Sequence, residues 1–208
     1  MIKDIYLLVG GEATRLRPLS EGIPKALLTI KGKLLIDLIL KKLDKSNLEN
    51  INLICSIKHE KFWLEYKKNS QFNVNLHFEH EKLDTAGFVV QNINNFSDKF
   101  LCMNGDLLIE MNFNSFLEVA NNSKNSTICS IPVDDPSRYG VLELDGTKII
   151  NFIEKPEDMK YGNNISLGVY CLHKKDIKEI KDKLEIPCSF EKNVFPNLAD
   201  NNLSLIHI

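Results

Sequence analysis

The sequence predicts an α/β fold with a Rossmann-like, mostly parallel sheet flanked by helices and a small β-hairpin insertion. Residues 5–9, 51–57 and 100–103 are apolar runs without polar alternation, as is typical of strands buried on both faces of a parallel sheet. Helical patterns separate the first strands, which favours right-handed crossovers between parallel neighbours. With 208 residues and 43% hydrophobic content, the chain is long enough to form one domain, residues 1–208, around a substantial core.

Helical periodicity marks the connections between the first strands. Apolar residues recur at i, i+3, i+4 and i+7 over 34–45, which predicts an amphipathic helix packed on the sheet. A second helix is predicted over 59–68. Its aromatic cluster, Phe62, Trp63 and Tyr66, favours core packing over a stacking platform for bases.

A hairpin signal appears in the second half of the chain. Two apolar runs, 141–144 and 148–153, flank Asp145-Gly146, and Asp-Gly between apolar runs is a strong turn signal. The other predicted elements are strands at 73–78, 126–133 and 165–170 and helices at 113–120 and 176–184.

Composition limits the possible partners. The net charge of −2 gives no general basic field for nucleic acid or an anionic membrane, so phosphate binding must be local. No apolar run approaches membrane-spanning length, and Met1 leads into the first strand without a signal-peptide pattern. We therefore expect a cytoplasmic protein that binds neither nucleic acid nor membrane.

The cysteines and histidines do not predict a metal centre. The five cysteines lie at scattered positions without a Cys-x-x-Cys pair, so we expect buried thiols acting as small hydrophobic residues. The five histidines show no i, i+4 pairing with carboxylates, and we expect them at the surface or in loops. These residues are Cys55, Cys102, Cys129, Cys171, Cys188, His59, His77, His80, His173 and His207.

The stretch 8–25 follows the first strand and carries groups suited to a polyphosphate. Gly10 and Gly11 permit positive φ and let backbone N–H groups approach an anion. The hydroxyl and cationic side chains are Thr14, Arg15, Arg17 and Lys25. Guanidinium and ammonium groups both bind phosphate oxygens. A glycine pair alone is ordinary turn punctuation beside a solvated basic loop, so the phosphate interpretation depends on the whole string.

This string is neither a Walker A loop nor a Rossmann fingerprint. It resembles the signature of the sugar-phosphate nucleotidyltransferases, Gly-Gly-x-Gly-Thr-Arg-Leu-x-Pro-Leu-Thr followed by Pro-Lys, and departs from it at Ala13 and Ser20. The resemblance implies the nucleotide-diphospho-sugar transferase type of fold, with Arg15 and Lys25 as catalytic cations. It also implies a substrate-binding loop that contains Val9, Gly10, Gly11 and Thr14.

A candidate metal ligand follows the strand at 100–103. Asn104-Gly105-Asp106 places a carboxylate at the carboxyl end of a parallel strand, where open α/β sheets bind ligands. Taken alone, Gly-Asp is also a common start of a turn. In the family resembled, Asn-Gly-Asp carries the metal aspartate. The resemblance therefore implies that Asp106 holds Mg²⁺ and that Asn104 contacts substrate.

The segment 79–87 leads into a short predicted helix. By its chemistry, Asp84 or Thr85 is a possible helix N-cap. The segment also resembles the family's Glu-x-Pro-Leu-Gly-Thr-Ala-Gly, with lysine for proline and Asp84 for glycine. That likeness implies a nucleotide base and ribose pocket at Thr85, Ala86 and Gly87.

The hairpin region resembles the family's sugar-phosphate subsite, which we place at 138–170. Arg-Tyr-Gly-Val precedes the hairpin and Glu-Lys-Pro follows it. An exposed Glu-Lys pair alone is ordinary solvated surface. The resemblance implies sugar and phosphate contacts, and serine replaces the family's asparagine in this set. The implied contacts are Gly140, Glu154, Lys155 and Ser166, with Glu191 as a further sugar contact.

Together the motifs predict a sugar-1-phosphate nucleotidyltransferase that makes an NDP-sugar and pyrophosphate from an NTP and a sugar 1-phosphate. The Leu-x-Thr-Ala-Gly segment resembles the mannose-1-phosphate and heptose guanylyltransferases more than the thymidylyl branch, and this resemblance implies GTP with mannose 1-phosphate or a heptose 1-phosphate. Glucose-1-phosphate uridylyl or thymidylyl transfer, or a non-catalytic sensing subunit, are the alternatives, and a homo-oligomer stays open. The family continues into a segment with a second metal aspartate. The sequence up to Ile208 does not contain it, so we expect the domain to lack the family's C-terminal end.

Overall fold

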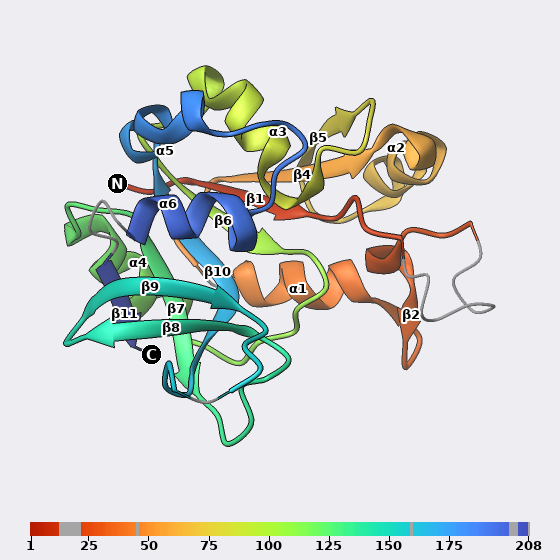
Figure 1. Ribbon diagram of the computed structural model, residues 1–208. Helices are drawn as coiled ribbons and strands as arrows, with labels where there is room; N and C mark the ends of the chain where they lie inside the picture. Colours follow the sequence, from red (N-terminus) through yellow and green to blue (C-terminus); the bar gives the residue numbers. More distant parts are fainter. Residues whose placement is uncertain (13–21, 45, 159, 200–203, 208) are drawn as a thin grey trace. The chain divides into compact units, whose positions relative to one another are not determined.

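A computed structural model describes residues 1–12, 22–44, 46–158, 160–199 and 204–207 (Figure 1). The chain forms two compact units, and each has its own core. Unit 1 comprises Met1–Ile2, Leu83–Leu101 and Ser115–Ile208, and unit 2 comprises Lys3–Lys82 and Cys102–Asn114.

The sheet of unit 2 is built from parallel strands. β1 (Asp4–Leu8) pairs with β4 (Asn50–Ser56), and β4 pairs with β5 (Val74–Glu79), both in parallel register. The strand order is β5-β4-β1, and β6 (Lys99–Asn104) stands next to β1. The central residues of β1 and β4 are buried, as expected for strands covered on both faces.

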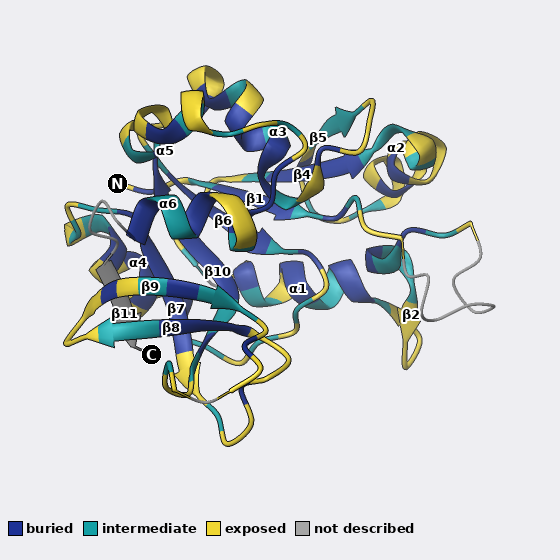
Figure 2. Cartoon of the chain, viewed as in Figure 1, coloured by how far each residue is buried: buried dark blue, intermediate teal, exposed yellow. Residues whose placement is uncertain are grey.

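Helices α1 (Leu35–Leu43) and α2 (Glu60–Asn69) belong to unit 2, and each has buried residues (Figure 2). The predicted apolar face of α1 is buried, because the spacing of its apolar residues places them on one side of the helix. Shorter elements are the 3₁₀ turns η2 (Lys25–Leu27) and η3 (Ile57–His59) and the strands β2 (Thr29–Ile30) and β3 (Lys33–Leu34).

The aromatic cluster of α2 follows the prediction at two of its three positions. Trp63 and Tyr66 are buried and meet edge to face with 5.9 Å between ring centroids. Phe62 is 42% exposed, so the prediction of core packing is wrong for this residue. Phe62 precedes Trp63 in α2, so its side chain points in another direction from the helix axis than those of Trp63 and Tyr66. The residues packed around the helix cover the latter two more fully.

Unit 1 contains a mixed set of strands in the order β10-β7-β11-β9-β8. β8 and β9 form the predicted antiparallel hairpin, and Gly146 in its turn has a φ of 61°. β10 runs antiparallel to β7, whereas β11 runs parallel to β7. The strands are β7 (Thr127–Pro132), β8 (Gly140–Asp145), β9 (Lys148–Glu154), β10 (Asn164–His173) and β11 (Ser204–His207).

Helices and an aromatic cluster complete unit 1. Phe152, Tyr170, Phe190 and Phe195 pack together, with ring centroids 4.7–5.5 Å apart. The helices are α3 (Asp84–Asn92), η4 (Ile93–Asn95), α4 (Phe113–Asn122, which begins in unit 2), α5 (Lys174–Ile180), η5 (Lys181–Lys183), the π-helix η6 (Phe190–Val194) and α6 (Phe195–Ala199).

The predicted fold class is confirmed: a mostly parallel sheet flanked by helices, with a small hairpin. All five cysteines are buried as free thiols, as expected from the sequence. No described helix is both long enough and apolar enough to cross a lipid bilayer.

His173 contradicts the prediction that the histidines lie at the surface or in loops. It ends β10 and is 3% exposed, because the strand carries it into the core of unit 1. Within the described residues its Nε2 atom has no hydrogen-bond partner. Burial lowers the pKa of His173 to about 4, assisted by Lys99 and Lys175 and opposed by Asp176.

The buried imidazole makes stability depend on pH. Below about pH 6.5 the unfolded chain binds a proton at His173, whereas the folded chain stays neutral there until about pH 4. We therefore expect the free energy of unfolding to decrease by about 3 kcal/mol, through His173, as the pH falls through this window. Urea unfolding at several pH values from 7 to 4 measures this decrease. In the His173→Phe variant the free energy of unfolding should fall less steeply with decreasing pH. Substituting exposed His80 with glutamine is the control, and an equal change of slope in both variants would contradict the prediction.

Candidate active site

The backbone after β1 continues along β4 before it leaves the sheet. The Val9 N–H donates to the Ile54 carbonyl at 3.0 Å. At Gly10 a Cβ atom would lie 3.0 Å from the Glu79 carboxylate, whereas at Gly11 a Cβ would meet nothing within 4 Å. Neither glycine has a positive φ, so that part of the sequence argument is wrong. The missing Cβ at Gly10 leaves room for the Glu79 carboxylate, and the missing Cβ at Gly11 leaves the end of the strand open.

Much of the predicted phosphate loop lies outside the described residues. This applies to the predicted contacts and cations and to both departures from the family signature: Ala13, Thr14, Arg15, Arg17 and Ser20. The two ends of the loop are described, and they meet. Glu12 and Pro24 form an isolated antiparallel bridge, and the Lys25 N–H donates to the Gly11 carbonyl at 3.5 Å. Lys25 is therefore held beside the end of β1.

Asp106 reaches the same place from β6. The Gly105 N–H donates to the Leu8 carbonyl at 3.0 Å, which ties this turn to the last residue of β1. A Cβ at Gly105 would lie 2.4 Å from Val9 Cγ1 and 2.7 Å from the Leu8 carbonyl oxygen, so only glycine fits. The predicted meeting of the glycine loop and the carboxylate at one sheet edge is therefore observed within unit 2.

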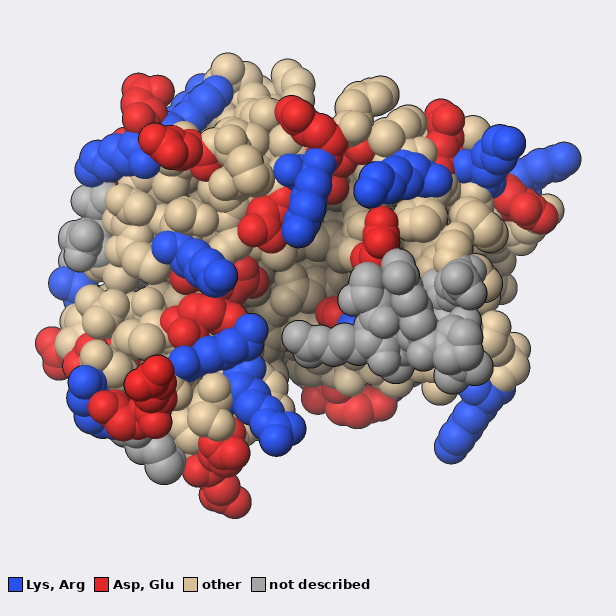
Figure 3. Space-filling view, turned by 45° about the vertical axis from the view of Figure 1, so that its right-hand side comes forward, with Lys and Arg blue, Asp and Glu red and all other residues tan. Residues whose placement is uncertain are grey.

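Lys25 and Asp106 are in direct contact. The Lys25 Nζ atom donates to Asp106 Oδ2, and the side chains are 38% and 40% exposed. Asn104, the last residue of β6, is half-buried two residues before Asp106. On the face drawn in Figure 3, acidic and basic side chains are interspersed, so attraction of a polyphosphate would depend on local cations such as Lys25.

Thr85 joins two distant segments of unit 1. Its hydroxyl donates to Glu191 Oε2 at 2.9 Å and accepts from the Phe190 N–H at 2.9 Å. The start of α3 is thereby attached to η6. Glu191, expected from the sequence only as a sugar contact, is oriented by this hydrogen bond.

Ala86 and Gly87 are buried against the segment before η6. The Ala86 N–H donates to the Cys188 carbonyl at 3.0 Å, and a Cβ at Gly87 would lie 2.8 Å from Leu83 Cβ. Burial, with a smaller effect of the Asp84 carboxylate, raises the pKa of the Cys188 thiol to about 11. This thiol therefore stays protonated at neutral pH and is a poor nucleophile.

Asp84 occupies a left-handed backbone position with a φ of 62°. Its Oδ1 atom accepts from the N–H of Thr85, but neither side chain caps α3, whose N-cap is Leu83. The simple N-cap interpretation is therefore not observed. Glycine adopts this conformation without a Cβ penalty, which explains physically why glycine is usual at this place in the motif.

The hairpin brings three predicted residues together in unit 1. Gly140 and Glu154 are register partners, and the Lys155 N–H donates to the Tyr139 carbonyl at 2.9 Å. Lys155 Nζ lies 3.0 Å from Glu154 Oε1, with the glutamate mostly buried and the lysine exposed. A Cβ at Gly140 would lie 2.4 Å from the Phe152 ring and 3.2 Å from Glu154 Oε2. Glycine at 140 therefore leaves room for the glutamate.

Ser166 lies on β10 beside the hairpin. The preceding residue, Ile165, is the register partner of Val141 in β8. Ser166 itself is the register partner of Ser130 in β7. The Ser166 hydroxyl accepts from the Gly168 N–H at 3.3 Å. It is half-buried, so part of the side chain is open to solvent.

A comparison with known protein families identifies the family of this chain. The family described as Nucleotidyl transferase matches residues 5–205. The chain belongs to the nucleotidyl transferase family. The resemblance that the sequence motifs indicated is thereby confirmed.

Relatives in the nucleotidyl transferase family include mannose-1-phosphate guanyltransferases. A protein named putative mannose-1-phosphate guanyltransferase from Sulfolobus acidocaldarius is 38% identical over 188 residues, which cover 88% of this chain and 52% of the relative. A mannose-1-phosphate guanyltransferase from Hypocrea jecorina is 32% identical over 208 residues, covering 95% and 56%. The chain thus spans about half the length of the curated relatives it matches.

Solved structures of nucleotidyl transferases share the fold. HddC from Yersinia pseudotuberculosis complexed with GMP-PN matches with a TM-score of 0.80 and 28% identity, covering 100% of this chain and 91% of HddC. A putative glucose-1-phosphate thymidylyltransferase from Bacillus anthracis in complex with a sucrose has a TM-score of 0.82 at 22% identity, covering 99% and 87%. At the latter identity the likeness concerns the fold alone.

The residues of unit 2 fit a divalent cation of the kind expected for a nucleotidyl transferase. Mg²⁺ prefers oxygen ligands and often uses one or two carboxylates together with substrate phosphates. In the described parts of the chain, no three His, Cys, Asp or Glu side chains gather around one point. The Asp106 side chain is 40% exposed, so its carboxylate is accessible from solvent. A cation bound jointly by Asp106 and substrate phosphates is therefore compatible with these residues.

Proposed function

We propose that the chain is a sugar-1-phosphate guanylyltransferase, which joins GTP and mannose 1-phosphate or a heptose 1-phosphate to give a GDP-sugar and pyrophosphate. The observation that carries the proposal is the contact between Lys25 and Asp106 beside the end of β1. The contact supports the proposal because Lys25 is suited to bind phosphate, Asp106 is suited to bind a metal ion, and α/β proteins bind nucleotides at this edge of the sheet.

The reaction needs positioning and charge stabilisation more than acid–base chemistry. An oxygen of the sugar 1-phosphate attacks the α-phosphorus, a new P–O bond forms, and the bond between the α- and β-phosphates breaks to release pyrophosphate. The attacking oxygen is already anionic, so no protein base is required. Lys25 would hold the α-phosphate or the sugar phosphate, and Arg15 would offset charge on the leaving pyrophosphate.

Asp106 would hold the metal ion of the family. When bound, Mg²⁺ supplies positive charge that neutralises phosphate oxygens and lowers the barrier to the departure of pyrophosphate. With Asp106 committed to the metal ion, Lys25 would leave the carboxylate, and its long flexible side chain would allow it to turn toward the phosphates. The lysine then contributes to substrate binding rather than to a resting ion pair.

The choice of guanine rests on similarity. The segment at Thr85, Ala86 and Gly87 resembles the guanylyl branch, two relatives bear the name mannose-1-phosphate guanyltransferase, and HddC was solved with GMP-PN. In the proposed complex the start of α3 faces the base and ribose, and the hydrogen bond between Thr85 and Glu191 keeps the threonine in place.

The hairpin of unit 1 would supply the sugar-phosphate subsite. Glu154 is mostly buried and would accept hydrogen bonds from sugar hydroxyls, whereas exposed Lys155 would bind the phosphate. Gly140 would keep this space open. Ser166 offers one hydroxyl where an asparagine would offer two polar groups, so it would favour a different set of sugar hydroxyls.

A substrate panel tests the proposal. The four NTPs are each combined with mannose, glucose and heptose 1-phosphates and Mg²⁺, and pyrophosphate release is measured. We expect turnover with GTP and with mannose or a heptose 1-phosphate. Turnover only with UTP or TTP and glucose 1-phosphate would replace the guanylyl assignment by the uridylyl or thymidylyl alternative.

A non-catalytic sensing subunit is the second candidate function. It is favoured by Asp84, a charged residue that accepts a left-handed conformation where glycine is usual. A sensing subunit would bind GTP or the sugar phosphate in calorimetry and release no pyrophosphate with any pair of substrates. Binding without turnover across the whole panel would therefore support this second function over the transferase.

Changing Asp84 tests whether its charge weakens nucleotide binding. We expect Asp84→Gly to tighten GTP binding by about fivefold, because a carboxylate near a triphosphate repels it. Asp84→Asn is the matched control, since asparagine removes the charge and tolerates the left-handed conformation. Calorimetry should show tighter binding in both variants. Tightening in the glycine variant alone would assign the effect to the backbone, and no tightening in either would contradict the prediction.

A further inference from the structure

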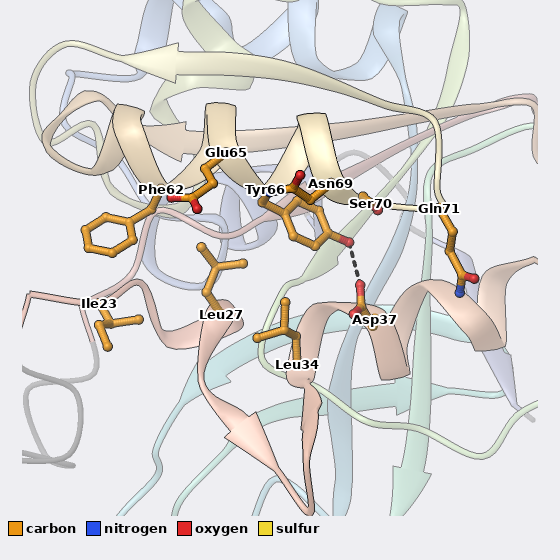
Figure 4. A pocket seen from close by; sticks show the side chains of 10 residues that line it. All are labelled: Ile23, Leu27, Leu34, Asp37, Phe62, Glu65, Tyr66, Asn69, Ser70 and Gln71. Carbon is orange, nitrogen blue, oxygen red and sulfur yellow. Dashed lines mark hydrogen bonds between the residues drawn. The ribbon is translucent and has the colours of Figure 1, made fainter.

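Unit 2 contains a cavity of about 650 Å³ whose described lining includes neither Lys25 nor Asp106 (Figure 4). It lies between α2 and the segment formed by η2, β3 and the first turn of α1. Phe62, Tyr66 and Asn69 face it from α2 at helical spacing. Its volume falls within the range of small-molecule sites, about 300–1,000 Å³.

The two ends of the cavity differ in chemistry. Ile23, Leu27, Leu34 and Phe62 form an apolar end, and the figure shows their side chains turned toward a common space. The other end is polar and is made by side chains from the C-terminal part of α2 and the residues after it. A fitting ligand therefore has an apolar body and a polar head.

Two carboxylates lie between these ends. The Tyr66 hydroxyl donates to Asp37 Oδ1 at 2.7 Å, so the phenol is oriented, and the other Asp37 oxygen has no hydrogen-bond partner among the described residues. Burial, together with the nearby Asp37, raises the pKa of Tyr66, so the phenol keeps its proton and remains the donor. Glu65, the residue before Tyr66 in α2, is exposed and also lines the cavity.

Neither carboxylate is neutralised by the described part of the protein. Asp37 is half-buried and Glu65 exposed, and neither forms an ion pair with a described residue. The described lining contains no lysine or arginine. A half-buried carboxylate without a cation is stabilised by a positively charged ligand and repels an anionic one.

We propose that this cavity binds a small organic cation, a protonated amine or amidine joined to an apolar ring or chain. The cationic head would lie between Asp37 and Glu65, and the apolar body would contact Leu27, Leu34 and Phe62. Phe62 would gain burial, which explains why a phenylalanine is left 42% exposed at the mouth of a cavity. Nucleotides and sugar phosphates are excluded by their charge.

The cavity adjoins the segment that carries Lys25. Ile23 and Leu27 line it, and they flank Pro24, Lys25 and Ala26 in the chain. A bound cation would contact this segment through Ile23 and Leu27. The binding proposal itself does not depend on the transferase reaction, so it is tested on the free protein.

The first experiment uses 2-phenylethylamine as the probe and 2-phenylethanol as its neutral control. Titrated into the ¹⁵N-labelled full chain, the amine should saturate with a Kd on the order of 1 mM, as expected for a ligand of this size. Shifts should concentrate at α2 and the first turn of α1. The alcohol should bind about tenfold more weakly because it cannot form charge-assisted hydrogen bonds.

Matched variants test the two carboxylates. Asp37→Asn and Glu65→Gln should each weaken amine binding by about tenfold and leave binding of the alcohol unchanged. Glu60→Gln is the control, because Glu60 belongs to the same helix but does not line the cavity. Raising the salt concentration should weaken the amine only, since screening acts on the charge.

Three outcomes would overturn the proposal. The first is no saturable binding of the amine, and the second is equal affinity for amine and alcohol. The third is a concentration-dependent shift of the same α2 resonances without any probe, which would mean that a second copy of the chain covers the cavity. Failure in any of these ways leaves the transferase proposal untouched, because the substrate panel reads pyrophosphate release.

Discussion

An Asp106→Asn variant is expected to lose about 10²–10³-fold in turnover of pyrophosphate release while the protein stays folded. The substitution keeps the shape of the side chain and removes the charge that would hold a cation against the substrate phosphates. Asp106 is 40% exposed and its ion pair with Lys25 contributes little to stability, about 0–1 kcal/mol. Thermal unfolding should therefore change little while the rate falls.

Two comparisons make this result specific. Glu110→Gln removes another carboxylate that pairs with a lysine, Lys42, in the same unit, and it should leave turnover unchanged. Lys25→Ala should lower turnover by a similar factor to Asp106→Asn, and the double variant should lose less than the product of the two, because the side chains act on the same phosphates. Normal turnover of Asp106→Asn would remove the carboxylate from the mechanism.

Local patterns explain what could be predicted from the sequence. The apolar run at 5–9 predicted β1 because a strand buried on both faces needs no alternation. The Asp145-Gly146 turn predicted the β8–β9 hairpin, and the positive φ of Gly146 is the feature that glycine supplies there. Such signals depend only on neighbours in the chain, so they can be read without tertiary structure.

Contacts between distant residues explain most of what could not be predicted. The pair Lys25 and Asp106 is separated by 81 positions, and the hydrogen bond from Thr85 to Glu191 by 106. Motif order indicated that Lys25 and Asp106 serve one site, but their direct contact follows from the fold. The sequence contains no signal that predicts the pairing of Thr85 with Glu191, because threonine and glutamate are both ordinary residues in a helix.

Burial was misjudged where tertiary packing overrides the local pattern. His173 is the last residue of β10 and is 3% exposed, whereas Phe62 begins an aromatic run and is 42% exposed. The sequence predicts Gly10 for its backbone freedom, yet its φ is not positive, and the fold instead brings the Glu79 carboxylate to 3.0 Å from the place of a Cβ. In each case the deciding neighbour lies far away in the chain.

Gly105→Ala is expected to destabilise the protein by about 3 kcal/mol and to lower turnover as well. The added Cβ would lie 2.4 Å from Val9 Cγ1 and 2.7 Å from the Leu8 carbonyl oxygen. Val9 can be shortened, but the backbone oxygen belongs to β1 and accepts the Gly105 N–H, so the turn must move. Asp106 would move with it. Urea unfolding and pyrophosphate release measure the two effects.

Gly11→Ala is the matched control for this substitution. A Cβ at Gly11 meets nothing within 4 Å, so stability should stay within about 0.5 kcal/mol of the parent protein, whereas turnover should fall if phosphates approach this backbone. Combining Val9→Ala with Gly105→Ala should restore only part of the lost stability, because the contact with the Leu8 carbonyl oxygen remains. Full recovery in the double variant would show that Val9 alone requires glycine at position 105, and an unchanged stability of Gly105→Ala would refute the steric account of how Asp106 is placed.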